Sequence, residues 1–103
     1  PAENDATQWH VYSVDLTKDA AVFRIDGVEK YRVSRTDITK HGPWAYDNSK
    51  YLLLNLAVGG VYTASMSGMQ DAPYPGVAAE TVDLIKAGKV RLLVDWVKVT
   101  AEP

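Results

Sequence analysis

The chain has 103 residues, of which 11 are basic and 13 acidic, and its net charge is −2. One domain of this length is feasible, although β-sandwiches and barrels commonly need about 200–250 residues. The charge is near neutral and no basic cluster occurs, which argues against nucleic acid as a partner. The lack of cysteine excludes disulfides and thiolate metal sites. No apolar run reaches the length of a membrane span.

The first predicted elements are a loop and a strand. Residues 1–8, PAENDATQ, are polar and aperiodic, which is typical of a loop. Because the chain starts with proline and without a signal peptide, we expect a mature or trimmed segment, such as a fragment of a longer protein. Residues 9–16 alternate, with His10, Tyr12 and Val14 on one face, and this alternation predicts a strand.

A hairpin should follow this strand. After a polar turn at residues 17–19, two extended runs at 21–25 and 28–33 flank Asp26-Gly27. Asp-Gly supplies the positive φ angles that a two-residue hairpin turn requires. The connection at residues 34–46 then offers one helical turn near 36–39, while Pro43 excludes regular structure after it.

Residues 50–60, KYLLLNLAVGG, predict a central strand. They are almost entirely apolar, so both faces of the strand should be covered. Asn55 is the exception. A buried amide without a partner costs about 1–3 kcal/mol, so Asn55 should either bond neighbouring backbone or point into a polar cleft.

The last third of the chain predicts a loop, a helix and a strand. Residues 61–76 are rich in Gly, Ser, Pro and Met, which favours a functional loop. Residues 78–87 carry a narrow apolar stripe, and Gly88 suits the position after a helix C-terminus. Residues 89–100, KVRLLVDWVKVT, predict a final strand that contains Asp95.

Five segments occur in an order that points to a known family: WHVYSVDL, FRIDG, PWAYD, LLLNLAVGG and LLVDWVKV. Together they resemble the C-terminal half of glycoside hydrolase family 16, in particular its laminarinase-like endo-β-1,3-glucanases. The resemblance implies an all-β fold, an antiparallel β-jelly roll sandwich of the concanavalin A-like lectin and glucanase type, with a glycan cleft. Residues 1–103 would be the C-terminal part of one such domain, a partial sandwich with one short helix, located extracellularly or in the cell envelope.

The catalytic residues of that family are not expected in this chain. Family members carry two glutamates in a motif E-x-D-x-x-E, and retaining hydrolysis needs two carboxyl groups about 5–5.5 Å apart. Residues 3–8 read E-x-D-x-x-Q. Gln8 cannot donate a proton as an acid, and the flanking residues lack strand character, so we interpret this segment as the leading loop. Whether the parent domain is an active enzyme stays open.

The resemblance implies four substrate-binding candidates, of which the first three also have a structural alternative. His10 would point into the cleft, or would be a hydrogen-bonded histidine under a sandwich edge. Trp44 would stack on a sugar or fill the core, where we also expect Tyr46. Asn55 would line the cleft or serve a structural role. Tyr62 stands where many members have a cleft tryptophan, and it would provide a platform.

Asp95 is the one candidate metal ligand. It matches an aspartate that in many family members helps to hold a structural calcium, although a single carboxylate makes no site by itself. The alternative is an ion pair with Lys98 or Arg91. No cofactor is required for the implied reaction.

Three functions follow as expectations. The chain would be part of a β-1,3-glucan hydrolase that supplies cleft walls, a non-catalytic β-glucan-binding module or inactive relative, or an interaction protein whose surface does the work. A lone half-sandwich would leave apolar faces and strand edges uncovered, so we expect it to dock onto the complementary N-terminal half or to dimerise.

Overall fold

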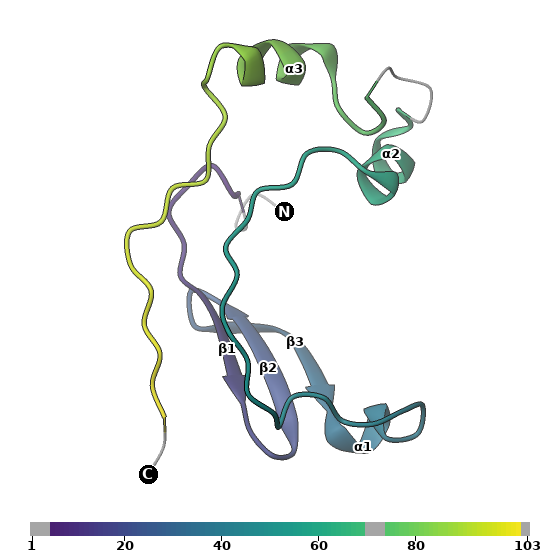
Figure 1. Cartoon of the computed structure of the whole chain (residues 1–103), viewed down its shortest axis with the longest axis vertical. Helices are drawn as coiled ribbons and strands as arrows, with labels where there is room; N and C mark the ends of the chain where they lie inside the picture. The colour runs from purple at the N-terminus through teal and green to yellow at the C-terminus, as the bar shows by residue number, and fades with distance from the viewer. Residues whose placement is uncertain (1–4, 70–73, 102–103) are drawn as a thin grey trace. The chain divides into compact units, whose positions relative to one another are not determined.

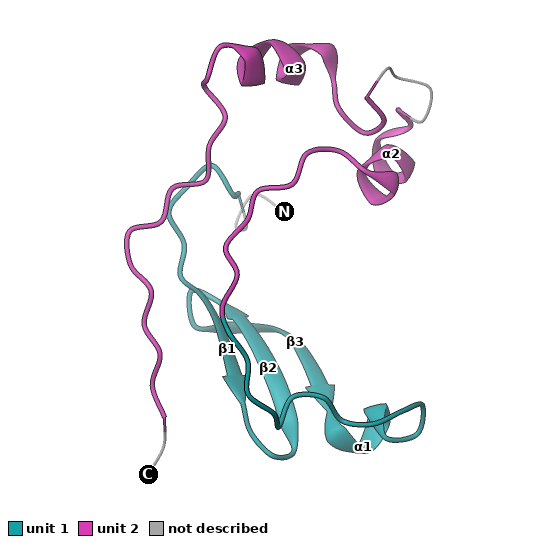
Figure 2. Cartoon of the chain, in the orientation of Figure 1, with its two compact units in different colours: residues 1–51 teal, residues 52–103 magenta. Residues whose placement is uncertain are grey.

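The computed structural model describes residues 5–69 and 74–101 (Figure 1). The chain divides into two compact units, unit 1 at Pro1–Tyr51 and unit 2 at Leu52–Pro103 (Figure 2). Unit 1 contains the sheet, and unit 2 contains two of the helices. Each unit is described by itself.

Unit 1 is built on a three-stranded antiparallel sheet in the order β1-β2-β3 (Figure 1). Its strands are β1 (Tyr12–Leu16), β2 (Ala20–Ile25) and β3 (Val28–Ser34). The predicted first strand and hairpin are therefore confirmed, although β1 begins three residues after the predicted start. The antiparallel β character that the sequence predicts is present in this unit.

The β2–β3 turn has the backbone that Asp-Gly predicts. Asp26 has a φ of 52° and Gly27 a φ of 81°. Two successive positive φ angles match the twist of the flanking strands, so the turn closes the hairpin with Ile25 opposite Val28. The register then shifts between Phe23 and Arg24. Such an irregularity re-aims the side chains on its two sides.

The strand register divides the sheet into an apolar and a polar face. Residues directly opposite each other in an antiparallel pair share a face. The apolar face carries Tyr12, Val14, Leu16, Ala21, Phe23, Ile25, Val28, Tyr31 and Val33. On the polar face, Arg24 forms an ion pair with Asp15, and Arg32 pairs with Glu29 at 2.6 Å. The two faces thus follow the period-2 pattern of the sequence.

A single helical turn, α1 (Arg35–Ile38), ends the sheet region. The Ser34 hydroxyl accepts the backbone N–H of Asp37 at 3.1 Å and lies 2.8 Å from the Asp37 carboxylate, to which it donates. A serine cap satisfies one of the backbone donors that a helix start leaves unpaired. This confirms the helical turn predicted in the connection.

Unit 2 contains α3 (Ala79–Lys86), which confirms the helix predicted there. Gly88 has a φ of 71°, and its N–H donates to the carbonyl of Ile85 at 2.9 Å. The N–H of Lys89 donates to Leu84 O at 3.0 Å. These two bonds make a Schellman motif, in which a glycine accepts the left-handed conformation that ends the helix.

The prediction of one short helix is wrong, because the described residues form three. The helix α2 (Val61–Ser67) lies where the sequence predicted a loop. The hydroxyls of Thr63 and Ser67 donate to carbonyls one turn earlier, Gly60 O at 3.1 Å and Thr63 O at 2.6 Å. Gly68, with a φ of 73°, then ends the helix. The Gly, Ser, Pro and Met content suggested a loop here, but the serine and threonine hydroxyls bond within the helix.

The two apolar strands predicted at residues 50–60 and 89–100 are not present. Both stretches lack strand structure in the described residues (Figure 1), and Leu53 and Leu93 are 73% and 57% exposed. A strand needs a neighbour to pair its backbone N–H and C=O groups. No strand partner for either stretch occurs in residues 5–69 and 74–101, so the predicted doubly covered central strand is wrong for this structure.

Burial is limited in both units. Within the described ranges, the buried apolar residues are Ala20, Ala21, Val22 and Trp44 in unit 1, and Ala64 and Val77 in unit 2. Small side chains dominate, so each unit has only a minor core.

None of the described helices has both the length and the apolar character needed to cross a bilayer.

Candidate functional site

The five residues predicted to bind substrate or metal belong to both units. His10 and Trp44 lie in unit 1, whereas Asn55, Tyr62 and Asp95 lie in unit 2. Each is considered within its own unit.

His10 is held by hydrogen bonds at both ring nitrogens. Its Nδ1 lies 2.6 Å from Oδ2 of Asp26, and its Nε2 lies 2.8 Å from the carbonyl oxygen of Asp5. The His10 side chain is only 10% exposed, and its ring meets Tyr12 edge-on with centroids 6.0 Å apart. A substrate role for His10 would require one of these two hydrogen bonds to open.

Asp26 connects the hairpin turn to the segment before β1. Its Oδ1 accepts the backbone N–H of Val11 at 2.9 Å, and its own N–H donates to Val11 O at 2.8 Å. The sequence analysis assigned Asp26 only a turn role. The signal for the second role was the strand register, because pairing Tyr12 with Ile25 places the next residues outward, Val11 and Asp26, side by side.

The hydrogen bonds around His10 and Asp26 favour the charged forms of both side chains. The Val11 N–H, and then His10, hold the pKa of Asp26 below its usual range. The hydrogen bond to Asp26, and then that to the Asp5 carbonyl, raise the pKa of His10. Hydrogen bonding to the charged form of a group favours that form. The arrangement therefore stabilises an imidazolium beside a carboxylate.

Residues 5–8 form a turn, which we call the 5–8 loop. Oδ1 of Asp5 accepts the N–H of Thr7 at 2.9 Å and its hydroxyl at 2.7 Å, and the N–H of Gln8 donates to Asp5 O at 3.1 Å. The Thr7 backbone bond, followed by its hydroxyl, lowers the pKa of Asp5. This Asx-type turn confirms the leading loop for these four residues, while Glu3 lies outside the described residues.

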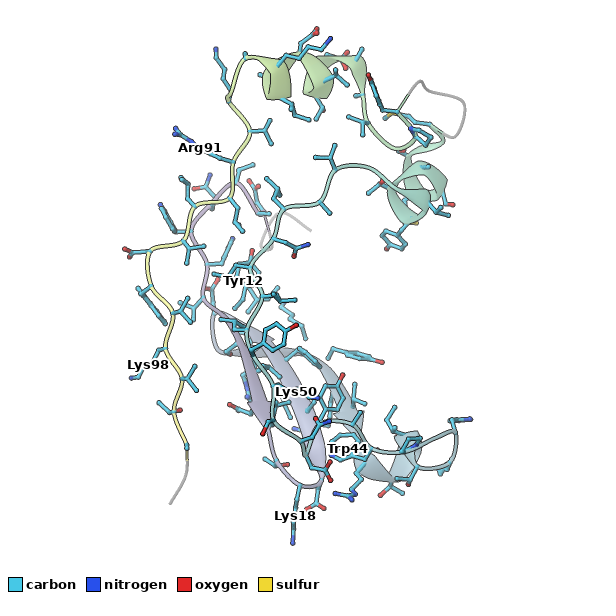
Figure 3. All side chains as sticks on the ribbon, viewed as in Figure 1. Tyr12, Lys18, Trp44, Lys50, Arg91 and Lys98 are labelled. Atoms are coloured by element: carbon cyan, nitrogen blue, oxygen red, sulfur yellow. The ribbon has the colours of Figure 1, made fainter. Side chains whose placement is uncertain are left out.

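Trp44 lies inside unit 1 and not on its surface. It is 7% exposed, and its ring meets Tyr46 edge-on with centroids 5.0 Å apart. Lys50 Nζ lies 5.8 Å from the centroid of the Tyr46 ring, a cation–π distance; Figure 3 labels Trp44 and Lys50. Since stacking on a sugar needs an open ring face, the position of Trp44 favours its alternative role as core filler.

The Trp44 indole leaves one polar atom unpaired. Its Nε1 is buried without a hydrogen-bond partner. A buried donor of this kind costs about 1–3 kcal/mol, so the aromatic contact with Tyr46 has to offset part of that cost.

The unit 2 candidates are all exposed. Asn55 lies in the unpaired stretch, so the burial on which its predicted cleft or backbone role depended is not observed. Tyr62 lies on α2 and is 76% exposed, which leaves its ring free to stack. Asp95 is exposed, and within residues 5–69 and 74–101 no group of three or more His, Cys, Asp or Glu could hold a metal. The calcium role of Asp95 stays a prediction.

Unit 2 also contains an apolar hollow that the sequence analysis did not predict. Its volume is about 160 Å³, and its lining includes Leu56, Val58, Val77, Ile85 and Val90. The lining carries no charged side chain. Aliphatic groups suit such a surface better than hydroxyl-rich sugars do.

No family model matches the chain, and no curated protein or solved structure is significantly similar to it. The assignment of a family therefore remains a proposal that depends on the five ordered sequence segments.

Proposed function

We propose that this chain is part of a glycan hydrolase domain resembling the endo-β-1,3-glucanases of glycoside hydrolase family 16, in which it supplies walls of the glycan cleft. The observation that carries the proposal is the order of the five segments along the sequence. The first two of them, WHVYSVDL and FRIDG, contain β1 and the second half of β2 with the turn that follows it, and these two strands are neighbours in an antiparallel sheet. This pairing supports the jelly-roll interpretation.

The exposed stretches of unit 2 give the proposal a physical argument. LLLNLAVGG and LLVDWVKV are strongly apolar, yet most of their large side chains face solvent. Large exposed apolar segments are unfavourable in water and usually mark a surface that another element covers. In the proposed jelly roll, these stretches are strands, and the complementary N-terminal half pairs with them and covers them.

Tyr62 is the residue best placed to contact a glucan. Its ring is exposed on α2, and an aromatic face packs against the apolar face of a pyranose ring. The two catalytic carboxyl groups, which retaining hydrolysis needs about 5–5.5 Å apart, would come from the complementary half, because the sequence given contains no E-x-D-x-x-E motif. The resemblance also carries the proposed location, which is extracellular or in the cell envelope.

Incubation with laminarin tests this proposal. We expect the isolated chain to bind laminarin and to release no reducing sugar. The variant Tyr62→Ala should weaken binding about 10-fold or more, which corresponds to roughly 1.4 kcal/mol. Tyr74→Ala is the matched control, because Tyr74 is an exposed tyrosine that, unlike Tyr62, does not lie beside one of the five segments, and it should leave binding unchanged. Release of sugar would disprove the claim that the chain lacks the catalytic pair. Failure to bind laminarin would contradict the proposed role in glucan binding.

A non-catalytic β-glucan-binding module or inactive relative is the second candidate. The Asx-type turn at Asp5 is compatible with it, because Asp5 bonds the backbone and hydroxyl of Thr7 and a binding module needs no catalytic carboxyl pair. The intact mass of the natural product separates the two functions. A companion polypeptide carrying E-x-D-x-x-E would support the hydrolase, and a complete product of 103 residues would support the binding module.

A further inference from the structure

We propose that His10 acts as a pH-sensitive clasp between the 5–8 loop and the β2–β3 turn. The protonated imidazole binds the loop to the turn, and the loop is released when the imidazole loses a proton. This device does not depend on the proposed glucan chemistry, since it involves only unit 1.

The hydrogen-bond geometry identifies the protonated form. A backbone carbonyl can only accept, and an ionised carboxylate can only accept. With Asp5 O at 2.8 Å and Asp26 Oδ2 at 2.6 Å, both ring nitrogens of His10 have to donate. Only the imidazolium carries two N–H groups. In either neutral tautomer, one nitrogen lone pair would face an oxygen lone pair.

When His10 loses a proton, one of its two hydrogen bonds should break and the other should remain. A bond to an ionised carboxylate is stronger than a bond to a neutral carbonyl. A neutral His10 should therefore keep its Nδ1 proton on Asp26 and lose the bond from Nε2 to Asp5 O. The Val11 bonds to Asp26 do not involve the imidazole, so they should persist. Deprotonation thus releases the loop without opening the hairpin.

The groups around His10 favour its charge. The carboxylates of Asp26 and Asp5 both attract the imidazolium. The Lys30 charge acts on Asp26 and favours its ionised form. Tyr12 adds the edge-on ring contact. Among the described residues, these are the titratable groups that face the clasp.

The pH window follows from the two shifts. The pKa of His10 is raised, so its stabilising contribution is complete below the ordinary value of 6.5 and is lost as the pH rises through the raised pKa. The pKa of Asp26 is lowered, so its contribution is complete above 3.8 and is lost as the pH falls through the lowered pKa. The clasp should be fully closed between pH 3.8 and 6.5.

An NMR titration of the full chain tests the clasp. The sequence has two histidines, so the variant His41→Gln leaves His10 as the single imidazole. We expect its midpoint above pH 6.5, and we expect the amide signals of Thr7 and Gln8 to shift with the same midpoint. A midpoint at or below 6.5, or loop amides that do not follow the imidazole, would overturn the proposal.

Two charge variants in the same background identify the partner. Asp26→Asn keeps an oxygen for the Val11 N–H but removes the negative charge beside His10, so the imidazole midpoint should fall. Asp15→Asn removes the same charge from β1, where Asp15 pairs with Arg24 and not with His10, and it should move the midpoint far less. Equal shifts in both variants would indicate a general charge effect and would overturn the clasp. The titration of His41→Gln alone decides the proposal even if Asp26→Asn disturbs the turn.

Discussion

Gly76 shows at the residue scale how closely the backbone segments of unit 2 approach each other. A Cβ added there would lie against Thr63 and 2.8 Å from the backbone nitrogen of Ala64, and the φ of Gly76 is 79°. The change Gly76→Ala should therefore lower the free energy of unfolding by about 1–3 kcal/mol. Urea denaturation followed by the helical circular dichroism signal measures the loss.

Gly42→Ala is the control for this substitution. Nothing lies within 4 Å of a Cβ added at Gly42, so its effect should stay within about 0.5 kcal/mol. If both variants lose the same stability, the close approach at Gly76 is not a structural constraint.

Single residues were predictable where the chain itself determines their conformation. The positive φ angles at Asp26 and Gly27 follow from the dipeptide. Burial was harder, because it depends on what covers a side chain and not on the side chain. Asn55 was expected to be buried and is exposed, whereas Trp44 is buried. The contact between His10 and Asp26 required the strand register, which the sequence analysis did not derive.

At the scale of elements, the β2–β3 turn allows the energetic cost of a left-handed backbone conformation to be measured without a steric clash. Gly27 has a φ of 81°, and nothing lies within 4 Å of a Cβ added there. Gly27→Ala should therefore destabilise the hairpin by about 1–2 kcal/mol through the left-handed backbone alone. Gly27→Asn should lose less, because asparagine tolerates this conformation better than alanine. Thermal unfolding of both variants gives the comparison, and equal losses would argue against a conformational cause.

The elements that formed as predicted have local signals. The hairpin has Asp-Gly, α1 has the Ser34 cap, and α3 is followed by Gly88 in the left-handed conformation. The apolar stretches at residues 50–60 and 89–100 have strand composition but depend on a distant partner for backbone pairing. Composition therefore identified them as strand-like without determining that they pair. The helix α2 was missed because a segment rich in Gly, Ser, Pro and Met was interpreted as a loop, whereas the hydroxyls of Thr63 and Ser67 bond backward along a helix.

At the scale of the whole molecule, the small cores and the exposed apolar stretches have a common explanation. The described residues include one three-stranded sheet, and no second sheet covers its apolar face. A β-sandwich buries the inner face of each sheet against the other. A chain of 103 residues with one apolar sheet face and two exposed apolar stretches is consistent with the proposed partial sandwich, which needs a complementary layer to bury these residues fully.

That need predicts self-association when the chain is isolated. Leu53 and Leu93 are exposed in the two stretches, and fully burying a leucine contributes about 1.5–3 kcal/mol. We expect sedimentation velocity to show association that increases with protein concentration. The double variant Leu53→Lys with Leu93→Lys should weaken it at least about 10-fold, because it removes apolar area and places a charged side chain in each exposed strand-like segment, where association would have to desolvate it.

The matched control adds the same two charges without removing the leucines. Asn48→Lys with Thr100→Lys places them at polar positions away from Leu53 and Leu93, and it should associate more strongly than the leucine variant. If the two double variants associate equally, net charge and not apolar burial governs the contact. A compact monomer at every concentration would mean that the exposed stretches need no covering layer, and the physical support for a missing half of the sandwich would then be lost.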